Sequence, residues 1–333
     1  MDLVKLGLHG KSILRLVDLT DEQVIGLVEL AAELKARKKS GANKKDALLY
    51  RKNIALIFQK SSTRTHCATV CGVHDEGGCT EYLNAHDLHF GKKESVKDSA
   101  RVLGRMFDGI MFRGFAQQTV DDLAKYSGIP VWNGLTDEWH PSQVLADFLT
   151  IKEHFGTLKG LKMAFVGDGR NNVASSLMIG CSKVGMDFVD VCPEELSPSQ
   201  ELLEMAREGA RRNGCTIEVS HDPVNGVKGA NILYTDVWVS MGEEALFQQR
   251  LALLRPFQVN MEMVRNTGLA ESGKVIFLHC LPAFHDNNTE VSKDCGALEV
   301  SDEVFESPIS KVFDEAENRL HTIKAMIVSS LAD

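Results

Sequence analysis

The chain lacks the features that would assign it to a membrane-spanning or nucleic-acid-binding class. None of its apolar runs approaches the length that spans a bilayer, so we expect a soluble globular protein. Its net charge of -9 leaves no overall basic excess, which argues against binding to nucleic acid. An anionic small molecule would therefore need local cations, and these gather between His89 and Arg113: Lys92, Lys93, Lys97, Arg101, Arg105 and Arg113.

Paired cysteines are also lacking. The eight cysteines include no C-x-x-C pair and no spacing typical of a small disulfide-rich domain, so we expect reduced thiols and a cytoplasmic protein. The sequence from Met1 to Leu6 has neither the apolar core of a signal peptide nor the Arg- and Ser-rich character of a transit peptide.

A dinucleotide-binding motif is incomplete. The run Val166-Gly167-Asp168-Gly169 follows a predicted strand, but the G-x-G-x-x-G pattern is not met. No acidic residue follows the next strand in the ribose-binding place, because Cys192 comes after Val191. We therefore expect no nicotinamide cofactor.

Strand and helix patterns alternate along the chain in two sets, and 333 residues suffice for two domains. Strands are predicted at 54–58, 80–83, 109–112 and 130–133, then at 163–168, 188–191, 217–219, 232–234 and 275–278. Helices are predicted after the capping box at Thr20, at 63–75, from 95, and at 120–126, 141–154 and 314–331. This alternation predicts an α/β protein with two doubly wound parallel-sheet domains, with ligands between them at the carboxyl ends of strands.

The stretch Ser62-Thr63-Arg64-Thr65 directly follows the first buried strand, at the start of a helix. A helix N-terminus offers unpaired N–H groups and a positive dipole end, and an arginine fork fits phosphate oxygens, so this stretch can bind a phosphate. Taken by itself, the stretch is better explained as an ordinary serine cap beside a solvated arginine.

Three further motifs accompany it: His140-Pro141-Ser142-Gln143, the segment Asp236 to Gly242, and His279-Cys280-Leu281-Pro282. Together, and in this order, the four motifs resemble the aspartate/ornithine carbamoyltransferase family over nearly the whole chain. The Ser240-Met241-Gly242 and His279 to Pro282 elements resemble its ornithine branch.

The resemblance implies transfer of a carbamoyl group from carbamoyl phosphate to the terminal amine of L-ornithine, giving L-citrulline and phosphate. It implies a carbamoyl-phosphate-binding domain at 1–145 with the terminal helix 314–333, and an ornithine-binding domain at 150–312. No cofactor and no metal are implied. Neither the biosynthetic nor the catabolic direction is favoured.

Site residues carried over from the family fall into two groups. Carbamoyl phosphate would be bound by Ser62, Thr63, Arg64, Thr65, His89, Arg113, His140, Gln143, Cys280, Leu281 and Arg319, with Arg113, His140 and Cys280 catalytic. Ornithine would be bound by Asn172, Asp236, Ser240 and Met241. Asp236 supplies a counter-charge for an α-ammonium, whereas a dicarboxylate such as aspartate would need cations there.

Cys280 has two possible roles. It could be a nucleophile, or its sulfur and the Leu281 carbonyl could orient the ornithine amine and the carbamoyl amide, as the resemblance implies. We expect orientation, because adjacent strand residues point to opposite faces and His279 would then not activate the thiol.

The chain departs from the family pattern beside the first motif. Gln59 and His66 stand where the family usually has a glutamate and an arginine, and the loss of that arginine removes one permanent charge near the phosphate site. Downstream, Cys67, Cys71 and His74 share a helical face, with Cys79 beyond. One helix presents three ligands to a metal awkwardly, so we expect buried thiols that face the sheet instead.

Assembly is the last expectation. In the family, the residue matching His89 reaches a neighbouring subunit's carbamoyl phosphate, so the resemblance implies a homotrimer with shared active sites; a solvated loop histidine is the alternative. Two other functions remain open: a sister transferase for another amine such as putrescine or an acylated ornithine, and a non-catalytic homologue.

Overall fold

A computed structural model describes residues 3–84, 90, 93–239 and 247–332. The chain forms two compact units, Met1–Leu149 with Glu317–Asp333, and Thr150–Ala316, and each is described by itself. None of the helices in the described part of the chain combines the length and apolar character needed to cross a bilayer.

The first unit is built on a four-stranded parallel sheet in the order β2-β1-β3-β4. Its strands are β1 (Asn53–Phe58), β2 (Cys79–Asn84), β3 (Gly109–Arg113) and β4 (Val131–Leu135). Its helices are α1 (Leu3–Leu6), α2 (Asp21–Ser40), α3 (Thr63–Asp75), α4 (Val96–Leu103) and α5 (Gln117–Ser127), with parts of α6 (Pro141–Phe155) and α12 (Val312–Leu331).

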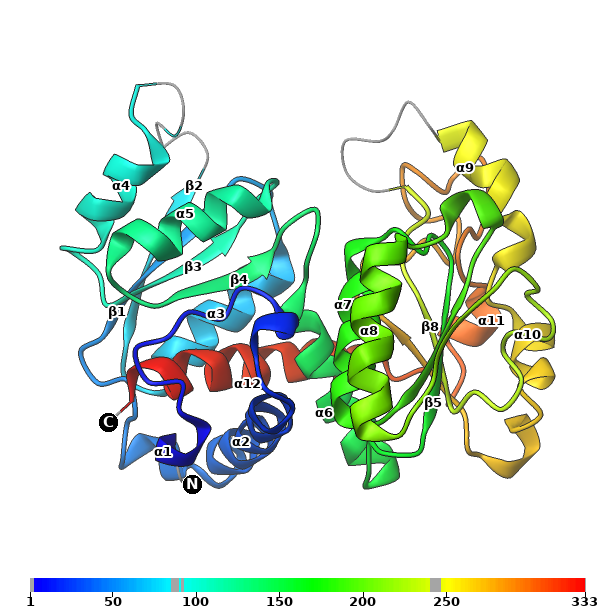
Figure 1. The fold of residues 1–333 in the computed structure, drawn as a ribbon, viewed down its shortest axis with the longest axis horizontal. Helices are drawn as coiled ribbons and strands as arrows, with labels where there is room; N and C mark the ends of the chain where they lie inside the picture. The colour runs from blue at the N-terminus through cyan, green and yellow to red at the C-terminus, as the bar shows by residue number, and fades with distance from the viewer. Residues whose placement is uncertain (1–2, 85–89, 91–92, 240–246, 333) are drawn as a thin grey trace. The chain divides into compact units, whose positions relative to one another are not determined.

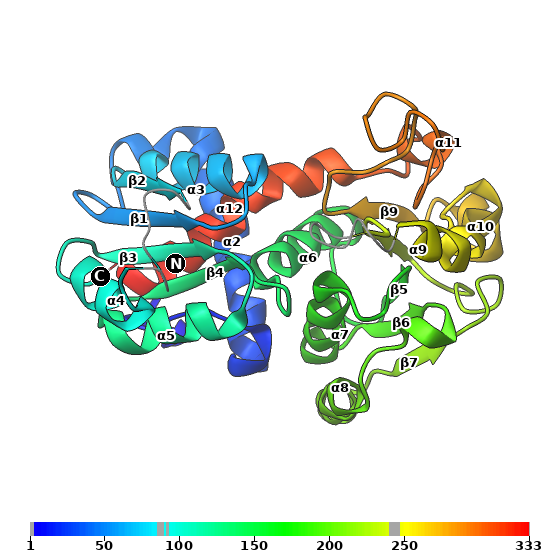
Figure 2. The same cartoon turned by 90° about the horizontal axis from the view of Figure 1, so that it is seen from above.

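Helices cover both faces of this sheet (Figures 1 and 2). On one face, Ala55 and Ile57 of β1 pack in one cluster with Leu103 of α4 and with Val120 and Leu123 of α5. The other face carries α3 and α12, which pack so closely that a Cβ at Gly72 would lie 3.4 Å from the Leu320 carbonyl oxygen. The alternation of strand side chains therefore buries both faces of β1.

The second unit holds a five-stranded parallel sheet in the order β7-β6-β5-β8-β9. Its strands are β5 (Lys162–Val166), β6 (Asp187–Val191), β7 (Ile217–Ser220), β8 (Ile232–Thr235) and β9 (Ile276–His279). Its helices are α7 (Asn172–Val184), α8 (Gln200–Asn213), α9 (Phe247–Leu254), α10 (Met261–Asn266) and α11 (Asp302–Phe305).

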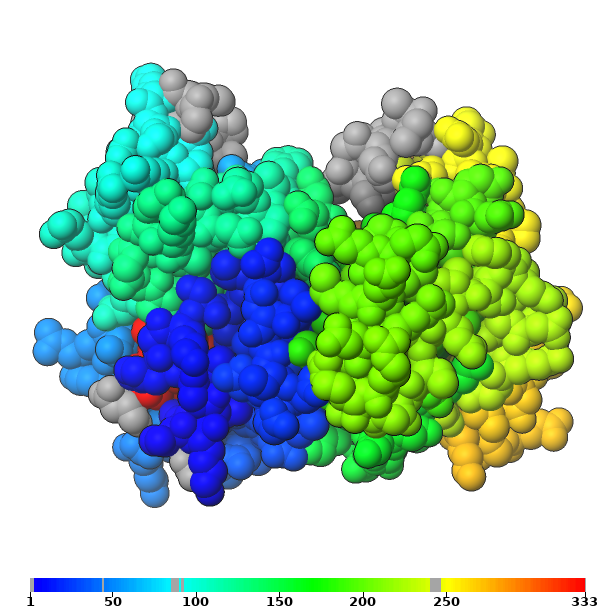
Figure 3. Space-filling view, in the orientation of Figure 1, coloured from blue at the N-terminus to red at the C-terminus, as the bar shows by residue number. Residues whose placement is uncertain are grey.

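This sheet is also covered on both faces. Ala164 and Val166 of β5 join the cluster that contains Val264 of α10 and Val304 of α11. Met163, which alternates with them, contacts Cys181 of α7. Helix α8 lies outside α7 at the surface of the unit (Figure 3), and its buried side chains recur at helical spacing: Leu203, Ala206, Gly209 and Ala210. The prediction of two doubly wound parallel-sheet domains is thus confirmed for the fold.

One expectation about α3 is wrong. Cys67, Cys71 and Cys79 are exposed rather than buried against the sheet. The helix turns its Thr65, Ala68, Thr69, Gly72 and Val73 face inward, toward the sheet and α12, which leaves the cysteine face on the outside. The small residues that allow the close approach of α12 decided which face is buried.

Candidate active site

The N-terminus of α3 is formed by the first motif. Ser62 has extended backbone, and its hydroxyl oxygen accepts a hydrogen bond from the Thr65 N–H at 3.2 Å, so it caps the helix. The motif therefore stands at the carboxyl end of β1, at a helix start, as predicted. Thr65 is fully buried, while Arg64 is partly exposed.

Two arginines reach the Thr65 hydroxyl from other elements. Arg319 of α12 donates from Nη2 to Thr65 Oγ1 at 3.0 Å, and Arg113, the last residue of β3, approaches the same oxygen from Nη1 at 3.5 Å. Both guanidinium groups are buried. Two buried permanent positive charges at a helix N-terminus create a strongly anion-attracting position.

The H-P-S-Q motif lies on the same cluster. Arg319 Nη1 donates to Gln143 Oε1 at 2.6 Å, and Arg319 Nη2 donates to Ser142 Oγ at 3.2 Å. Gln143 in turn donates from Nε2 to Asp147 Oδ1 at 2.8 Å. These contacts fix the side-chain amide of Gln143 so that its oxygen faces the guanidinium of Arg319.

His140 immediately precedes Pro141, the first residue of α6, and is buried. Burial, together with the positive charges of Arg319, Arg113 and Arg64, holds the pKa of the His140 imidazole well below its ordinary value. The ring is therefore neutral at physiological pH, and it can donate one N–H hydrogen bond without adding charge. The Ser142 hydroxyl lies 3.4 Å from its Nδ1.

Most of the residues that were expected to bind the first substrate therefore lie together in the first unit: Ser62, Thr63, Arg64, Thr65, Arg113, His140, Gln143 and Arg319. His89 lies outside the described residues, so the structure does not place it.

In the second unit, Asp236 follows β8 and receives three hydrogen bonds. The donors are the Asn171 side-chain amide at 2.9 Å, the Val237 N–H at 2.8 Å and the Cys280 thiol at 3.0 Å. Asn171 also caps α7, because its Oδ1 accepts from the Val173 N–H at 2.6 Å. These bonds hold an acidic group, Asp236, beside the thiol of the H-C-L-P motif.

Of the remaining residues expected to bind ornithine, Asn172 is the first residue of α7, directly after the capping Asn171. Ser240 and Met241 lie outside the described residues. Leu281 follows Cys280 with a φ of 58°, a left-handed conformation that is uncommon for a residue with a side chain.

The side chains of His279 and Cys280 were expected to point to opposite faces of a strand, and this expectation is wrong. The imidazole, the thiol and the Asp236 carboxylate each place one ligand atom within 4.8 Å of the others. The strand β9 ends at His279, so strand alternation no longer governs Cys280. However, both ring nitrogens already contact other groups, Leu281 N–H at 2.9 Å and Glu299 Oε1 at 3.2 Å, so neither is placed to take the thiol proton.

These three side chains are also a group of the kind that can bind a soft divalent metal. The same two contacts of His279 occupy both nitrogens, which removes the imidazole ligand from the set. A second such group, His285, Asp302 and Glu306, lies largely exposed.

The residues that the sequence reasoning missed include two polar ones, one in each unit. Ser142 links Arg319 to His140, and Asn171 links α7 to Asp236. Ser142 is the third residue of the H-P-S-Q motif, and Asn171 directly precedes Asn172, which was expected to bind ornithine. Each missed residue is a sequence neighbour of a residue that was expected to bind substrate. A polar residue next to such a residue at the start of a helix lies in the same environment, so its position in the sequence could have identified it.

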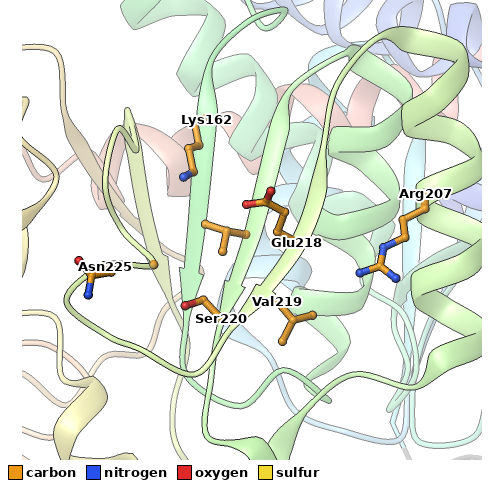
Figure 4. A pocket seen from close by; sticks show the side chains of 8 residues that line it. Lys162, Arg207, Glu218, Val219, Ser220 and Asn225 are labelled. Atoms are coloured by element: carbon orange, nitrogen blue, oxygen red, sulfur yellow. The ribbon is translucent and has the colours of Figure 1, made fainter.

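A hollow of about 440 Å³ lies elsewhere in the second unit (Figure 4). It is lined by Lys162, Val189, Arg207, Glu218, Val219, Ser220, Asn225 and Gly226. None of these residues belongs to the four motifs. Lys162 and Arg207 donate to the backbone carbonyls of Lys228 and Ile217, so their charges are engaged in holding local structure.

Comparison with known proteins decides the family. Residues 11–153 match the carbamoyl-P binding domain of aspartate/ornithine carbamoyltransferases, and residues 159–330 match their Asp/Orn binding domain. The chain belongs to the aspartate/ornithine carbamoyltransferase family.

Individual relatives within this carbamoyltransferase family match over nearly full length. A catabolic ornithine carbamoyltransferase of Bacillus licheniformis is 52% identical, with 98% of each chain covered. Another from Bacillus cereus is 51% identical, covering 100% of this chain and 99% of its own. The solved structure of ornithine carbamoyltransferase from Pyrococcus furiosus aligns with a TM-score of 0.89 at 44% identity, covering 97% of this chain and 98% of that one.

Proposed function

We propose that this carbamoyltransferase transfers the carbamoyl group of carbamoyl phosphate to the terminal amine of L-ornithine, forming L-citrulline and phosphate. The names of its full-length relatives support ornithine as the acceptor. The observation that carries the proposal is the convergence of Arg113 and Arg319 on Thr65, at the capped N-terminus of α3.

Carbamoyl phosphate carries a phosphate that must be held and then released. Ser62, Thr63, Arg64 and Thr65 would bind it through backbone N–H groups, hydroxyls and a guanidinium. Arg113 and Arg319 bring two further positive charges to the same helix start. Since the leaving phosphate gains negative charge in the transition state, these cations stabilise departure more than binding.

Attack on the carbamoyl carbon places negative charge on its oxygen. His140, neutral because burial and three arginines lower its pKa, would donate an N–H to this oxygen, and Arg113, whose charge acts on His140, would share it. Donors preorganised in this way are each worth about 3–4 kcal/mol of barrier. Gln143 Oε1, which already accepts a hydrogen bond from Arg319, would also accept one from the carbamoyl amide.

The amino-acid half of the reaction would use the second unit. Asp236 offers a carboxylate to the α-ammonium of ornithine, and Asn172, Ser240 and Met241 would bind the rest of the polar head. Cys280 and the Leu281 carbonyl would orient the terminal amine. Asp236 also discriminates against an acylated α-amine, because an amide would leave the carboxylate without a counter-charge.

The attacking amine must be neutral. With a lysine-like pKa near ~10.4, it is mostly protonated at pH 7, and forming the neutral amine there costs about 4–5 kcal/mol. Turnover at subsaturating ornithine therefore rises from pH 7 toward pH 9 in this proposal.

We further propose a cytoplasmic homotrimer in which His89 completes a neighbour's carbamoyl-phosphate site. The location is supported by the eight cysteines, none of which forms a disulfide in the part of the chain that the structure describes. The trimer rests on the family resemblance of the His89 loop, and a head-to-tail contact that closes after three copies gives three equivalent sites.

The amine acceptor is tested by measuring ureido product formation from carbamoyl phosphate with L-ornithine, putrescine, N-acetyl-L-ornithine and L-aspartate. Ornithine should exceed each alternative by at least about 100-fold in kcat/KM, because the others lack the α-ammonium, the α-carboxylate or the terminal amine. A preference for putrescine would replace the proposal with the sister transferase, and no product with any amine would indicate a non-catalytic homologue.

A further inference from the structure

The loop that carries Cys280 and Leu281 is held by a buried histidine–glutamate pair. His279 and Glu299 are both fully buried. His279 Nδ1 accepts a hydrogen bond from the Leu281 N–H at 2.9 Å, and His279 Nε2 lies 3.2 Å from Glu299 Oε1. The same Glu299 oxygen accepts from the Phe284 N–H at 2.7 Å, so the pair contacts the loop near both of its ends.

These contacts fix the tautomer of the ring. A backbone N–H is always a donor, so Nδ1 of His279 must be the unprotonated nitrogen. The single ring proton therefore sits on Nε2 and points to the Glu299 carboxylate, a charge-assisted hydrogen bond. A second proton, on Nδ1, would break the bond to Leu281.

The Leu281 backbone depends on this bond. Its φ of 58° is disfavoured for a residue with a Cβ, and such a conformation persists only where the surroundings over-determine it. Beyond the ring, Glu315 Oε2 accepts from the His279 N–H at 2.9 Å, and Tyr234 donates to Glu315 Oε1 at 3.2 Å. The histidine is thus anchored on its backbone and side chain, and the strained residue is anchored on the histidine.

We propose that His279 and Glu299 are positioning residues that aim the Leu281 carbonyl and the Cys280 thiol at the reacting amine. This inference rests on the proposed function, since it assigns those two groups the task of orienting ornithine. Neither His279 nor Glu299 touches the substrate. Their effect on rate arises because a shift of about 1 Å in orienting groups can cost about 100-fold in turnover.

Two isosteric substitutions separate the two bonds of the ring. His279→Asn keeps a carbonyl oxygen near the position of Nδ1 and loses the donor to Glu299. His279→Gln keeps an N–H near the position of Nε2 and loses the acceptor for Leu281. Steady-state kinetics with both substrates, and thermal melting of each variant, are compared with the unmodified protein and with Leu203→Ala, a buried change in α8 that destabilises without touching the loop.

His279→Gln should lower kcat about 100-fold and leave the KM for carbamoyl phosphate within about threefold. His279→Asn should retain at least about tenfold more turnover than His279→Gln, even at equal melting temperature. Leu203→Ala should lose melting temperature without losing kcat. Equal kcat in the two His279 variants would overturn the proposal, since a purely structural role would affect both alike.

Glu299→Gln provides a second test of the positioning role if the His279 variants do not fold. It preserves shape and an acceptor for Phe284 but weakens the bond from Nε2, so kcat should fall about tenfold; an unchanged kcat would contradict the proposal. Failure of the proposed function looks different, because the unmodified protein would then form no citrulline.

Discussion

Arg319 and Thr65, 254 positions apart in the chain, are joined by a 3.0 Å hydrogen bond from Nη2 to Oγ1. The bond joins α12 to the start of α3, where we propose that the phosphate binds. The same guanidinium donates to Gln143 and Ser142, so one side chain organises two of the four motifs. The proposed function therefore gives the C-terminal helix a part in substrate binding.

The first prediction replaces this guanidinium. Arg319→Lys keeps the charge but cannot donate to Gln143, Thr65 and Ser142 together, so kcat/KM for carbamoyl phosphate should fall about 100-fold. The KM for ornithine should change less than about threefold. Initial rates at varied carbamoyl phosphate measure this, with Arg37→Lys as the control because Arg37 pairs with Glu76 and Asp46 instead. A loss confined to the KM for ornithine would refute the assignment.

The second prediction concerns stability at low pH. Burial and the nearby Lys324, Lys35 and Lys38 lower the pKa of His321 to about 3. Below the ordinary histidine value near ~6.5 the unfolded chain binds a proton that the folded protein does not bind until about pH 3, so stability falls as pH decreases through this window.

At pH 5 this group should cost about 1–2 kcal/mol of stability relative to pH 7.5. Urea unfolding of the unmodified protein and of His321→Asn at both pH values isolates the contribution, because other groups act equally in the two proteins. The loss of stability on acidification should be smaller in the variant. Parallel losses would show that His321 does not contribute.

A third prediction distinguishes the two roles of Cys280. The thiol donates to Asp236, and a serine hydroxyl can replace that donor. Cys280→Ser should therefore raise the KM for ornithine about tenfold and leave measurable turnover. If the thiol were a nucleophile, its loss would abolish the chemistry, and the unmodified enzyme mixed with carbamoyl phosphate alone would show a carbamoyl adduct by intact-mass measurement.

The fourth prediction addresses assembly. Arg64→Ala and His89→Ala homotrimers should each be nearly inactive. In any mixed cyclic trimer about one site in three would draw Arg64 and His89 from intact copies, so unfolding and refolding the two variants together should restore activity. If mixed trimers form, as shown by differently tagged chains, yet stay as inactive as their parents, the sites are not shared.

The fold was readable from the sequence because local signals and tertiary packing agree. The capping box at Thr20, the serine cap at Ser62 and the alternating apolar runs all specify the elements that form. The exposed Cys67 and Cys71 were not predictable in the same way. Helical spacing identifies which residues share a face, but the choice of the buried face depends on α12, which is distant in sequence.

The sequence predicted the site residues only where they belong to motifs. His140, Gln143 and Asp236 stand in recognised motifs, whereas Glu299 and Glu315 belong to none of the four motifs. Their contacts with His279 arise only when β9, the loop segment at Glu299 and the first turn of α12 come together. The burial of a carboxylate beside a loop depends on tertiary packing, so the spacing of residues along the sequence does not predict it.

The most direct test of the account is the stoichiometry of the reaction itself. Carbamoyl phosphate labelled with ¹³C at the carbonyl is incubated with L-ornithine and the enzyme, and ¹³C and ³¹P NMR follow both products at once. After subtraction of an enzyme-free sample, labelled citrulline and free phosphate should form in equal amounts, with both reduced about 100-fold or more in Arg64→Ala. Phosphate release that depends on the enzyme but yields no citrulline at saturating ornithine would contradict the proposed function.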